Sequence, residues 1–163
     1  MDSKTMDSKT INIYTDGSSR GNPGPGGYGI VMEQNATKYF KEFSEGYRMT
    51  TNNRMELLAV IEALKKLKKE RLKVVIYTDS KYVSDAVEKK WVFAWEKKNF
   101  KKKKNADLWS EFLKIYPKHT IKFIWIKGHN NHPQNERCDY LAVTASKKKE
   151  LLTDKGYEEN NNN

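Results

Sequence analysis

The sequence predicts an α/β or α+β domain, in which helices pack on a mixed sheet. Residues 10–18 and 73–80 have the apolar or alternating pattern of strands, and each segment carries Tyr-Thr-Asp near its end. A stretch with apolar residues at helical spacing lies between them. Since helices connect the later strands, those strands should run parallel to the first and place functional residues at their carboxyl ends.

The first three strands should form an antiparallel meander. A loop rich in glycine and proline, residues 17–27, follows the first strand, and we expect strands over 28–33 and 39–47 with a short connection. The loop is not a Walker phosphate loop, because no Gly-Lys-Ser/Thr ends it. It also leads into a strand rather than a helix, which excludes a dinucleotide-binding fingerprint.

Helices account for most of the remaining chain. The cluster Thr50–Asn53 offers N-cap residues for the first long helix, and Asn105 is a candidate cap for a helix over 106–115 that Pro117 stops. Further helices are expected over 79–87 and 135–149. The fifth strand should span 120–126.

Length and composition favour one domain, which we place at residues 10–149. The chain has 163 residues, no apolar run long enough for a membrane span and no visible secretory signal. The single cysteine, Cys138, excludes an internal disulfide and fits a reducing, cytoplasmic location. Residues 1–10 hold a direct repeat of Met-Asp-Ser-Lys-Thr, and we interpret residues 1–9 as disordered or cloning-derived. Residues 150–163 have the composition of a polar tail.

The positive charge is concentrated in one segment. The net charge is +10, and residues 89–104 contribute +7 through eight lysines and one acid. Such a segment suggests a polyanionic partner, usually nucleic acid. A solvated lysine face that only aids solubility would have the same composition, so composition does not decide between the two.

Four acidic residues are candidates for chemistry. Asp16 and Asp79 end predicted strands, Glu56 lies in the first turns of a helix, and Asp139 lies on the last helix beside apolar residues. A turn aspartate or a first-turn glutamate is the ordinary alternative. Burial of lone carboxylates is costly, and no basic residue accompanies all four, so a divalent metal is the economical partner. Oxygen ligands without a cysteine cluster point to Mg²⁺ or Mn²⁺ rather than zinc.

Five blocks of sequence, in order, closely resemble type 1 ribonuclease H. They are Tyr14–Ser18 with Gly21–Gly27, Thr51–Leu57, Tyr77–Val83, Lys127–His129, and Asn135–Asp139. The resemblance runs from about residue 10 to residue 146. It implies a ribonuclease H-like α/β fold, with a five-stranded mixed sheet in which strands one to three are antiparallel and strands one, four and five are parallel.

The resemblance also implies an activity: endonucleolytic hydrolysis of the RNA strand of RNA–DNA hybrids, leaving 5′-phosphate and 3′-hydroxyl ends. Asp16, Glu56, Asp79 and Asp139 match the family's metal-binding quartet, with two ions about 4 Å apart at the scissile phosphate. His129 matches the family's loop histidine, which moves protons near the leaving group or assists product release. A plain turn histidine is the alternative.

Hybrid recognition requires reading the 2′-hydroxyl, which neutral amides and hydroxyls can do. By resemblance, the polar residues near the hybrid backbone are Asn22, Thr51, Asn52, Asn53, Ser80 and Gln134. Asn52 and Asn53 could equally be plain helix caps. Met49 stands where family members often carry arginine, which puts the family's phosphate pocket for the DNA strand in question.

Residues 89–104 match the family's basic protrusion. Its lysines would hold phosphates and its aromatic residues would pack on DNA sugars, the candidates being Trp91, Trp95, Lys97, Lys98, Phe100 and Lys101. At helical spacing, at least one of the two tryptophans should instead be core. The competing functions are a DNA-processing nuclease of the same fold and a catalytically inactive hybrid-binding module. We expect a monomer with no membrane association.

Overall fold

The computed structural model describes residues 9–128 and 130–160. Five strands form one sheet in the order β3-β2-β1-β4-β5. β1 (Ile11–Ser19), β2 (Gly24–Gln34) and β3 (Phe40–Thr50) are an antiparallel meander. β4 (Lys73–Thr78) and β5 (Thr120–Trp125) continue the sheet in parallel with β1. The predicted mixed sheet is therefore confirmed.

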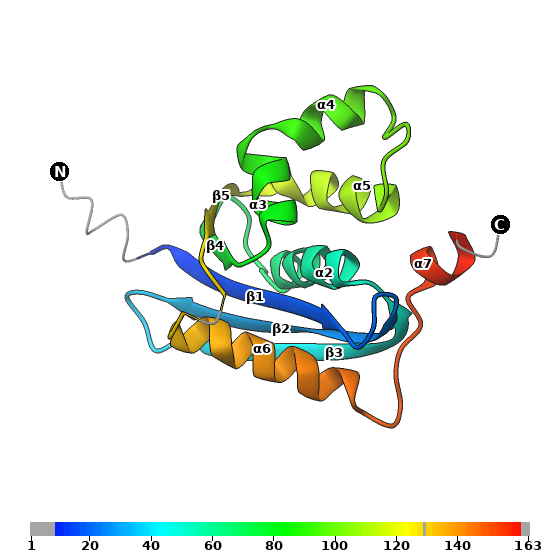
Figure 1. The fold of residues 1–163 in the computed structure, drawn as a ribbon. Helices are drawn as coiled ribbons and strands as arrows, with labels where there is room; N and C mark the ends of the chain where they lie inside the picture. Colours follow the sequence, from blue (N-terminus) through cyan, green and yellow to red (C-terminus); the bar gives the residue numbers. More distant parts are fainter. Residues whose placement is uncertain (1–8, 129, 161–163) are drawn as a thin grey trace.

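Helices cover both faces of the sheet (Figure 1). α2 (Asn52–Lys65), α3 (Lys81–Glu88), α4 (Trp91–Lys97) and α5 (Ala106–Ile115) lie on one side, and α6 (Pro133–Ser146) lies on the other. A short 3₁₀ turn, Tyr116–Lys118, follows α5, and α7 (Lys155–Asn160) ends the described chain. The main core fills the space between the sheet and α2, where Ile13, Ile30 and Leu57 are fully buried.

Several element boundaries differ from the predictions. β2 begins at Gly24 rather than at residue 28, because Gly26 and Gly27 pair with the end of β1 and shorten the expected loop. α3 begins at Lys81, since Ser80 accepts a hydrogen bond from the Val83 amide and acts as its N-cap. α6 begins at Pro133, capped by His132, and it ends at residue 146 rather than 149.

The segment expected to be a polar tail is folded as far as residue 160. Leu152 pairs with the β3 backbone: its amide donates to the Gly46 carbonyl, and its carbonyl accepts from the Arg48 amide. Asp154 is buried, and Arg48 forms an exposed ion pair with Glu158 on α7. This corrects the expectation for residues 150–160. Of the repeat over residues 1–10, only Lys9 and Thr10 belong to the described residues, and Thr10 is buried.

Candidate active site

Asp16 is held rigidly inside β1. Its side chain is buried, and the Gly17 amide donates a 2.9 Å hydrogen bond to its Oδ1. Gly17 is needed for a second reason: a Cβ at this position would collide with the backbone of Met55 and Glu56. The missing side chain therefore allows the first turns of α2 to cross β1 closely, and this crossing brings Glu56 beside Asp16.

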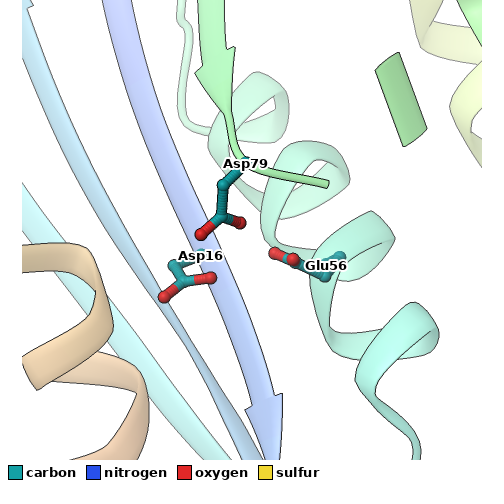
Figure 2. Close-up of side chains that lie close together, drawn as sticks. All are labelled: Asp16, Glu56 and Asp79. Atoms are coloured by element: carbon teal, nitrogen blue, oxygen red, sulfur yellow. The ribbon is translucent and has the colours of Figure 1, made fainter. Parts of the chain in front are cut away.

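Three carboxylates from three elements converge at this crossing. Oxygen atoms of Asp16 on β1, Glu56 on α2 and Asp79 at the end of β4 all lie within 4.8 Å of one another. Figure 2 shows their carboxylates pointing toward one another. Gly128, in the loop after β5, approaches this cluster so closely that a Cβ there would lie 2.7 Å from Asp79 Oδ2.

The cluster is electrostatically costly without a cation. Burial, followed by the charges of Asp79 and Asp139, raises the pKa of Asp16 to about 8. Burial and the same kind of repulsion, from Asp16 and Asp79, raise the pKa of Glu56 well above its usual value. Oε1 of Glu56 is buried, and within the described residues it has no hydrogen-bond partner. An orphaned oxygen among crowded carboxylates fits a hard divalent cation.

Asp139 stands beside this group rather than in it. It lies on α6, which approaches β2 closely because Gly29 has no side chain: a Cβ there would collide with the Cys138 carbonyl. Asp139 lines the same hollow of about 500 Å³ as the other three acids, and its charge and hydrogen bond raise the pKa of Asp16. The structure thus brings all four predicted acids to one hollow, and oxygen atoms of three of them lie within 4.8 Å of one another.

Polar residues from the start of α2 form the rim of the acidic hollow. Asn52 and Asn53 line it together with Ser80. Oδ1 of Asn52 accepts hydrogen bonds from the Ser19 amide at 2.6 Å and from its hydroxyl at 3.1 Å. The helix cap is Thr51, whose hydroxyl accepts from the Arg54 amide. Asn52 and Asn53 are therefore the first residues of the helix, and the interpretation of either as the cap is wrong.

A second hollow, of about 530 Å³, lies on the other side of the α2 N-terminus. Asn22, Thr51 and Asn53 line it, with Lys103 and Lys104 from the basic segment and Tyr157 from α7. The Asn52 amide donates to Asn22 Oδ1 at 3.2 Å, which ties the glycine-rich turn to α2. Met49 does not line this hollow and is 40% exposed.

Sequence reasoning missed the residue that organises this region, Arg54. Its buried guanidinium forms two hydrogen bonds with Asp107 on α5 and two with buried Asp154. It also donates to Asn105 Oδ1 at 3.3 Å. Asn105 occupies the N-cap position of α5, as predicted, but its side chain does not cap the helix and instead bonds Arg54 and the Tyr82 hydroxyl. An arginine in the first turn of an apolar helix face was the available signal, since such a charge needs buried partners.

The aromatic residues of the basic segment divide between surface and core. Trp91 is 47% exposed, with Lys89 Nζ 5.2 Å from its ring centre. Trp95 packs edge-on against buried Trp109, and Phe100 also contacts the core, so the prediction that one tryptophan is core is confirmed. Lys97, Lys98 and Lys101 are exposed.

The remaining predicted residues lie near the start of α6. Gln134 does not line the acidic hollow, and its Nε2 donates to Glu33 at 3.2 Å. His132 contacts the stacked rings of Tyr14 and Tyr77, at 5.5 and 6.5 Å between ring centres. His129 lies outside the described residues, although its neighbour Gly128 reaches Asp79.

Comparisons with known proteins agree with this geometry. A sequence model of the RNase H family matches residues 8–147. The Ribonuclease H of Desulforamulus reducens is 51% identical over 90% of this chain and 93% of its own length. That of Helicobacter pylori is 51% identical over 88% of this chain and 98% of its own.

Solved structures that resemble this chain are also ribonucleases H. The crystal structure of LC9-RNase H1, described as a type 1 RNase H with the type 2 active-site motif, superposes with a TM-score of 0.76. It is 35% identical and covers 93% of this chain and 80% of its own. LC11-RNase H1 in complex with an RNA/DNA hybrid gives a TM-score of 0.61 at 29% identity, covering 83% and 95%. With its sheet order, acidic cluster and near-complete sequence match, this chain belongs to the ribonuclease H family.

Proposed function

We propose that this chain cuts the RNA strand of RNA–DNA hybrids endonucleolytically, leaving 5′-phosphate and 3′-hydroxyl ends. The observation that carries the proposal is the convergence of three carboxylates within 4.8 Å in a chain of this family. Relatives about half identical in sequence are named Ribonuclease H, and a related structure holds an RNA/DNA hybrid.

The residues present fit divalent cations. We propose that Asp16, Glu56 and Asp79 hold Mg²⁺, or Mn²⁺, with Asp139 completing the set and two ions bound when substrate is present. When bound, such ions activate the attacking water and neutralise charge on the phosphate and the leaving oxygen. Burial holds Asp16 and Glu56 in place, and the Gly17 amide also fixes the carboxylate of Asp16, so these two ligands are preorganised for a cation.

The two hollows on either side of the α2 N-terminus suggest how the hybrid is held. The RNA strand would lie over the acidic hollow, where the amides of Asn52 and Asn53 and the Ser80 hydroxyl are near enough to read a 2′-hydroxyl. The DNA strand would pass over the second hollow, where Asn22, Thr51 and the lysines can receive a phosphate without the arginine that Met49 replaces.

The basic segment would add affinity without sequence preference. Lys97, Lys98 and Lys101 are exposed, as is the Trp91 ring, and we propose that they contact the DNA backbone and sugars. Trp95 and Phe100 would support this surface from below, because both pack on the core. Gln134 would contact the hybrid only after release from Glu33.

We propose a supporting role for His129, as a proton carrier or an aid to product release. Substitution His129→Ala should slow turnover far less than Asp16→Asn, because the metal ligands would remain. Single-turnover and steady-state rates on one hybrid would measure both variants. Equal, near-complete losses would contradict the supporting role.

Hydrolysis of an end-labelled hybrid tests the function directly. The hybrid, duplex DNA and duplex RNA are each incubated with Mg²⁺ or with EDTA, and the product ends are identified. We expect cleavage of the RNA strand of the hybrid only, and only with Mg²⁺. Cleavage of duplex DNA would favour a DNA-processing nuclease, and tight hybrid binding without cleavage would favour an inactive binding module.

None of the described helices is long and apolar enough to cross a membrane. We propose that the protein acts as a cytoplasmic monomer, and that its catalytic domain runs from residue 10 to residue 160, because the segment after α6 is folded against β3 and Arg54. Sedimentation of the full chain would test the monomer, with a concentration-dependent mass as the contrary result.

A further inference from the structure

The C-terminal helix α7 forms part of the second hollow, the one that Asn22 and the lysines line. Figure 1 shows the chain leaving α6 on one side of the sheet and reaching α7 on the side of α2. There α7 contributes Gly156, Tyr157 and Asn160 to the lining. None of the six residues of α7 lines the acidic hollow, so this helix is placed to touch a bound strand but not to take part in the chemistry.

The segment that carries α7 is attached to the domain at several points. Leu152 forms backbone hydrogen bonds with β3, and the buried carboxylate of Asp154 accepts from the Thr50 hydroxyl at 2.7 Å and from Arg54 at 2.8 Å. The amide of Tyr157 in turn donates to the carbonyl of Asp154 at 3.1 Å. These bonds make α7 a fixed wall of the hollow, because its first turn is anchored to a buried residue.

Gly156 allows α7 to lie directly on two other residues of the hollow. A Cβ at this position would collide with the Asp107 carboxylate and would lie 2.6 Å from Nη2 of Arg54. Both of those residues also line the hollow. Since only a residue without a side chain permits this approach, Gly156 determines that the half-buried Tyr157 next to it reaches the hollow.

The charge of the lining favours an anionic ligand. Three basic side chains line the hollow, and the one acid among them is Asp107. Both oxygens of Asp107 accept hydrogen bonds from Arg54, at 2.9 and 2.7 Å, so the charges of this pair largely cancel. Lys103 and Lys104 form no ion pair with any residue in the part of the chain that the structure describes. Their ammonium groups are therefore the main charges that a ligand would meet.

The combination of lysines with a tyrosine selects a nucleic-acid backbone. Such a backbone supplies a phosphate for the lysines and a sugar for the aromatic ring, and hydroxyl and amide side chains are common donors to phosphate oxygens. A free phosphate ion would leave the ring of Tyr157 without a partner. An acidic peptide would supply the charge but not the regular alternation of phosphate and sugar.

We propose that α7 belongs to the hybrid-binding surface and contacts the DNA strand. The Tyr157 hydroxyl donates to a phosphate of that strand, the ring lies against the adjacent sugar, and the exposed amide of Asn160 is a second donor. This inference rests on the proposed function, because it takes the hybrid as the ligand and places its DNA strand over the second hollow. It adds a contact from the C-terminal segment, which the chemistry of cleavage does not require.

Binding of a fluorescein-labelled hybrid to the full chain in EDTA, where the strand stays uncut, tests the contact apart from the reaction. Tyr157→Phe keeps the ring and should weaken binding about threefold, and Tyr157→Ala should weaken it about tenfold, which is about 1.4 kcal/mol. Tyr140→Ala is the matched control, because Tyr140 is 58% exposed on α6 and lines neither hollow. Thermal unfolding should show that Tyr157→Phe is folded as the wild type is. Equal affinity of the wild type and both Tyr157 variants would overturn the proposal.

A neutral phosphate placed in one strand at a time identifies the strand that α7 contacts. Each hybrid carries a single methylphosphonate at a known position, and binding is compared between the wild type and Tyr157→Phe. At one position in the DNA strand, the methylphosphonate should weaken binding by the wild type and leave Tyr157→Phe nearly unaffected, because both changes remove the same hydrogen bond. Coupling at a position in the RNA strand, or at no position, would refute the contact with DNA.

Amide hydrogen exchange provides a readout that a merely structural role of α7 would not change. Bound hybrid should slow exchange of the Leu152, Tyr157 and Glu158 amides at least about fivefold, because their hydrogen bonds hold the segment in place. Unchanged exchange in the complex would contradict the proposal. If the wild type cleaves the hybrid while these tests fail, only the role of α7 is wrong. If the wild type neither binds nor cleaves the hybrid, the proposed function is wrong as well.

Discussion

Replacing Asp16 with asparagine should make the metal-free protein more stable while removing its response to metal. At a pH above about 8, where Asp16 is charged, two unit charges 4.8 Å apart repel by about 3.5 kcal/mol at an effective dielectric constant of about 20. Asparagine keeps the shape of the side chain and removes this repulsion from Glu56 and Asp79. We therefore expect a gain of about 3 kcal/mol in EDTA at that pH, which corresponds to a rise in Tm of roughly 6–12 °C for a domain of this size.

Thermal unfolding of wild type and variant, with EDTA and with increasing Mg²⁺, measures both effects. Wild type should gain about 2.7 kcal/mol when Mg²⁺ reaches about one hundred times its Kd, and the variant should gain far less. Asp85→Asn is the matched control, because Asp85 forms only a surface pair with Lys89 at 3.6 Å and its loss should matter little. A lower Tm for Asp16→Asn in EDTA, or an unchanged Mg²⁺ shift, would refute the account of the cluster.

Three further predictions concern the packing of α2 on β1, the folded C-terminal segment and the basic segment. Gly17→Ala should cost several kcal/mol in urea unfolding and abolish cleavage, because its Cβ meets the α2 backbone, whereas Ser18→Ala should do neither. Asp154→Ala should cost about 3–5 kcal/mol, because it leaves the buried Arg54 with one carboxylate fewer; a loss below 1 kcal/mol in the same assay would count against a folded C-terminal segment. Neutralising the lysines at 101–104 should raise KM and flatten its salt dependence while the single-turnover rate stays nearly intact, and an unchanged salt slope would exclude phosphate contacts there.

The sequence was sufficient for the sheet and for most of the acidic cluster. Asp16 and Asp79 each follow Tyr-Thr, and although β1 continues to Ser19, Tyr14 pairs with Tyr77 between the parallel neighbours β1 and β4. The two acids therefore had to meet near the carboxyl ends of these strands. Glu56 was predictable as a helix residue near the apolar face. Its closeness to Asp16 was not, because it depends on the backbone crossing that Gly17 permits.

Contacts between distant segments were beyond sequence reasoning. Asp154 lies 100 residues from Arg54, in a stretch whose polar composition is typical of a tail, and only the folded chain reveals that this polarity is internal. The prediction of the N-cap of α2 was also incomplete, because it rested on local sequence alone. Threonine and asparagine have similar preferences for the N-cap, so local propensity could not decide between Thr51 and Asn52.

The placement of nearby cations explains why the acidic cluster is left for a metal. Arg54 lies only two residues before Glu56, but the hydrogen bonds of its guanidinium go to Asp107, Asp154 and Asn105. Lys81 lines the acidic hollow, yet its Nζ lies 4.7 Å from the centre of the Trp125 ring, whose indole N–H donates to the Asp79 carbonyl. Within the described residues, no ion pair reaches any of the four acids. A basic side chain placed there would relieve the repulsion in the free protein, but it would occupy the position that a catalytic cation needs. The fold therefore accepts a local loss of stability near Asp16, while the Arg54 guanidinium, two residues before Glu56, is held by other carboxylates and leaves the cluster free for a cation.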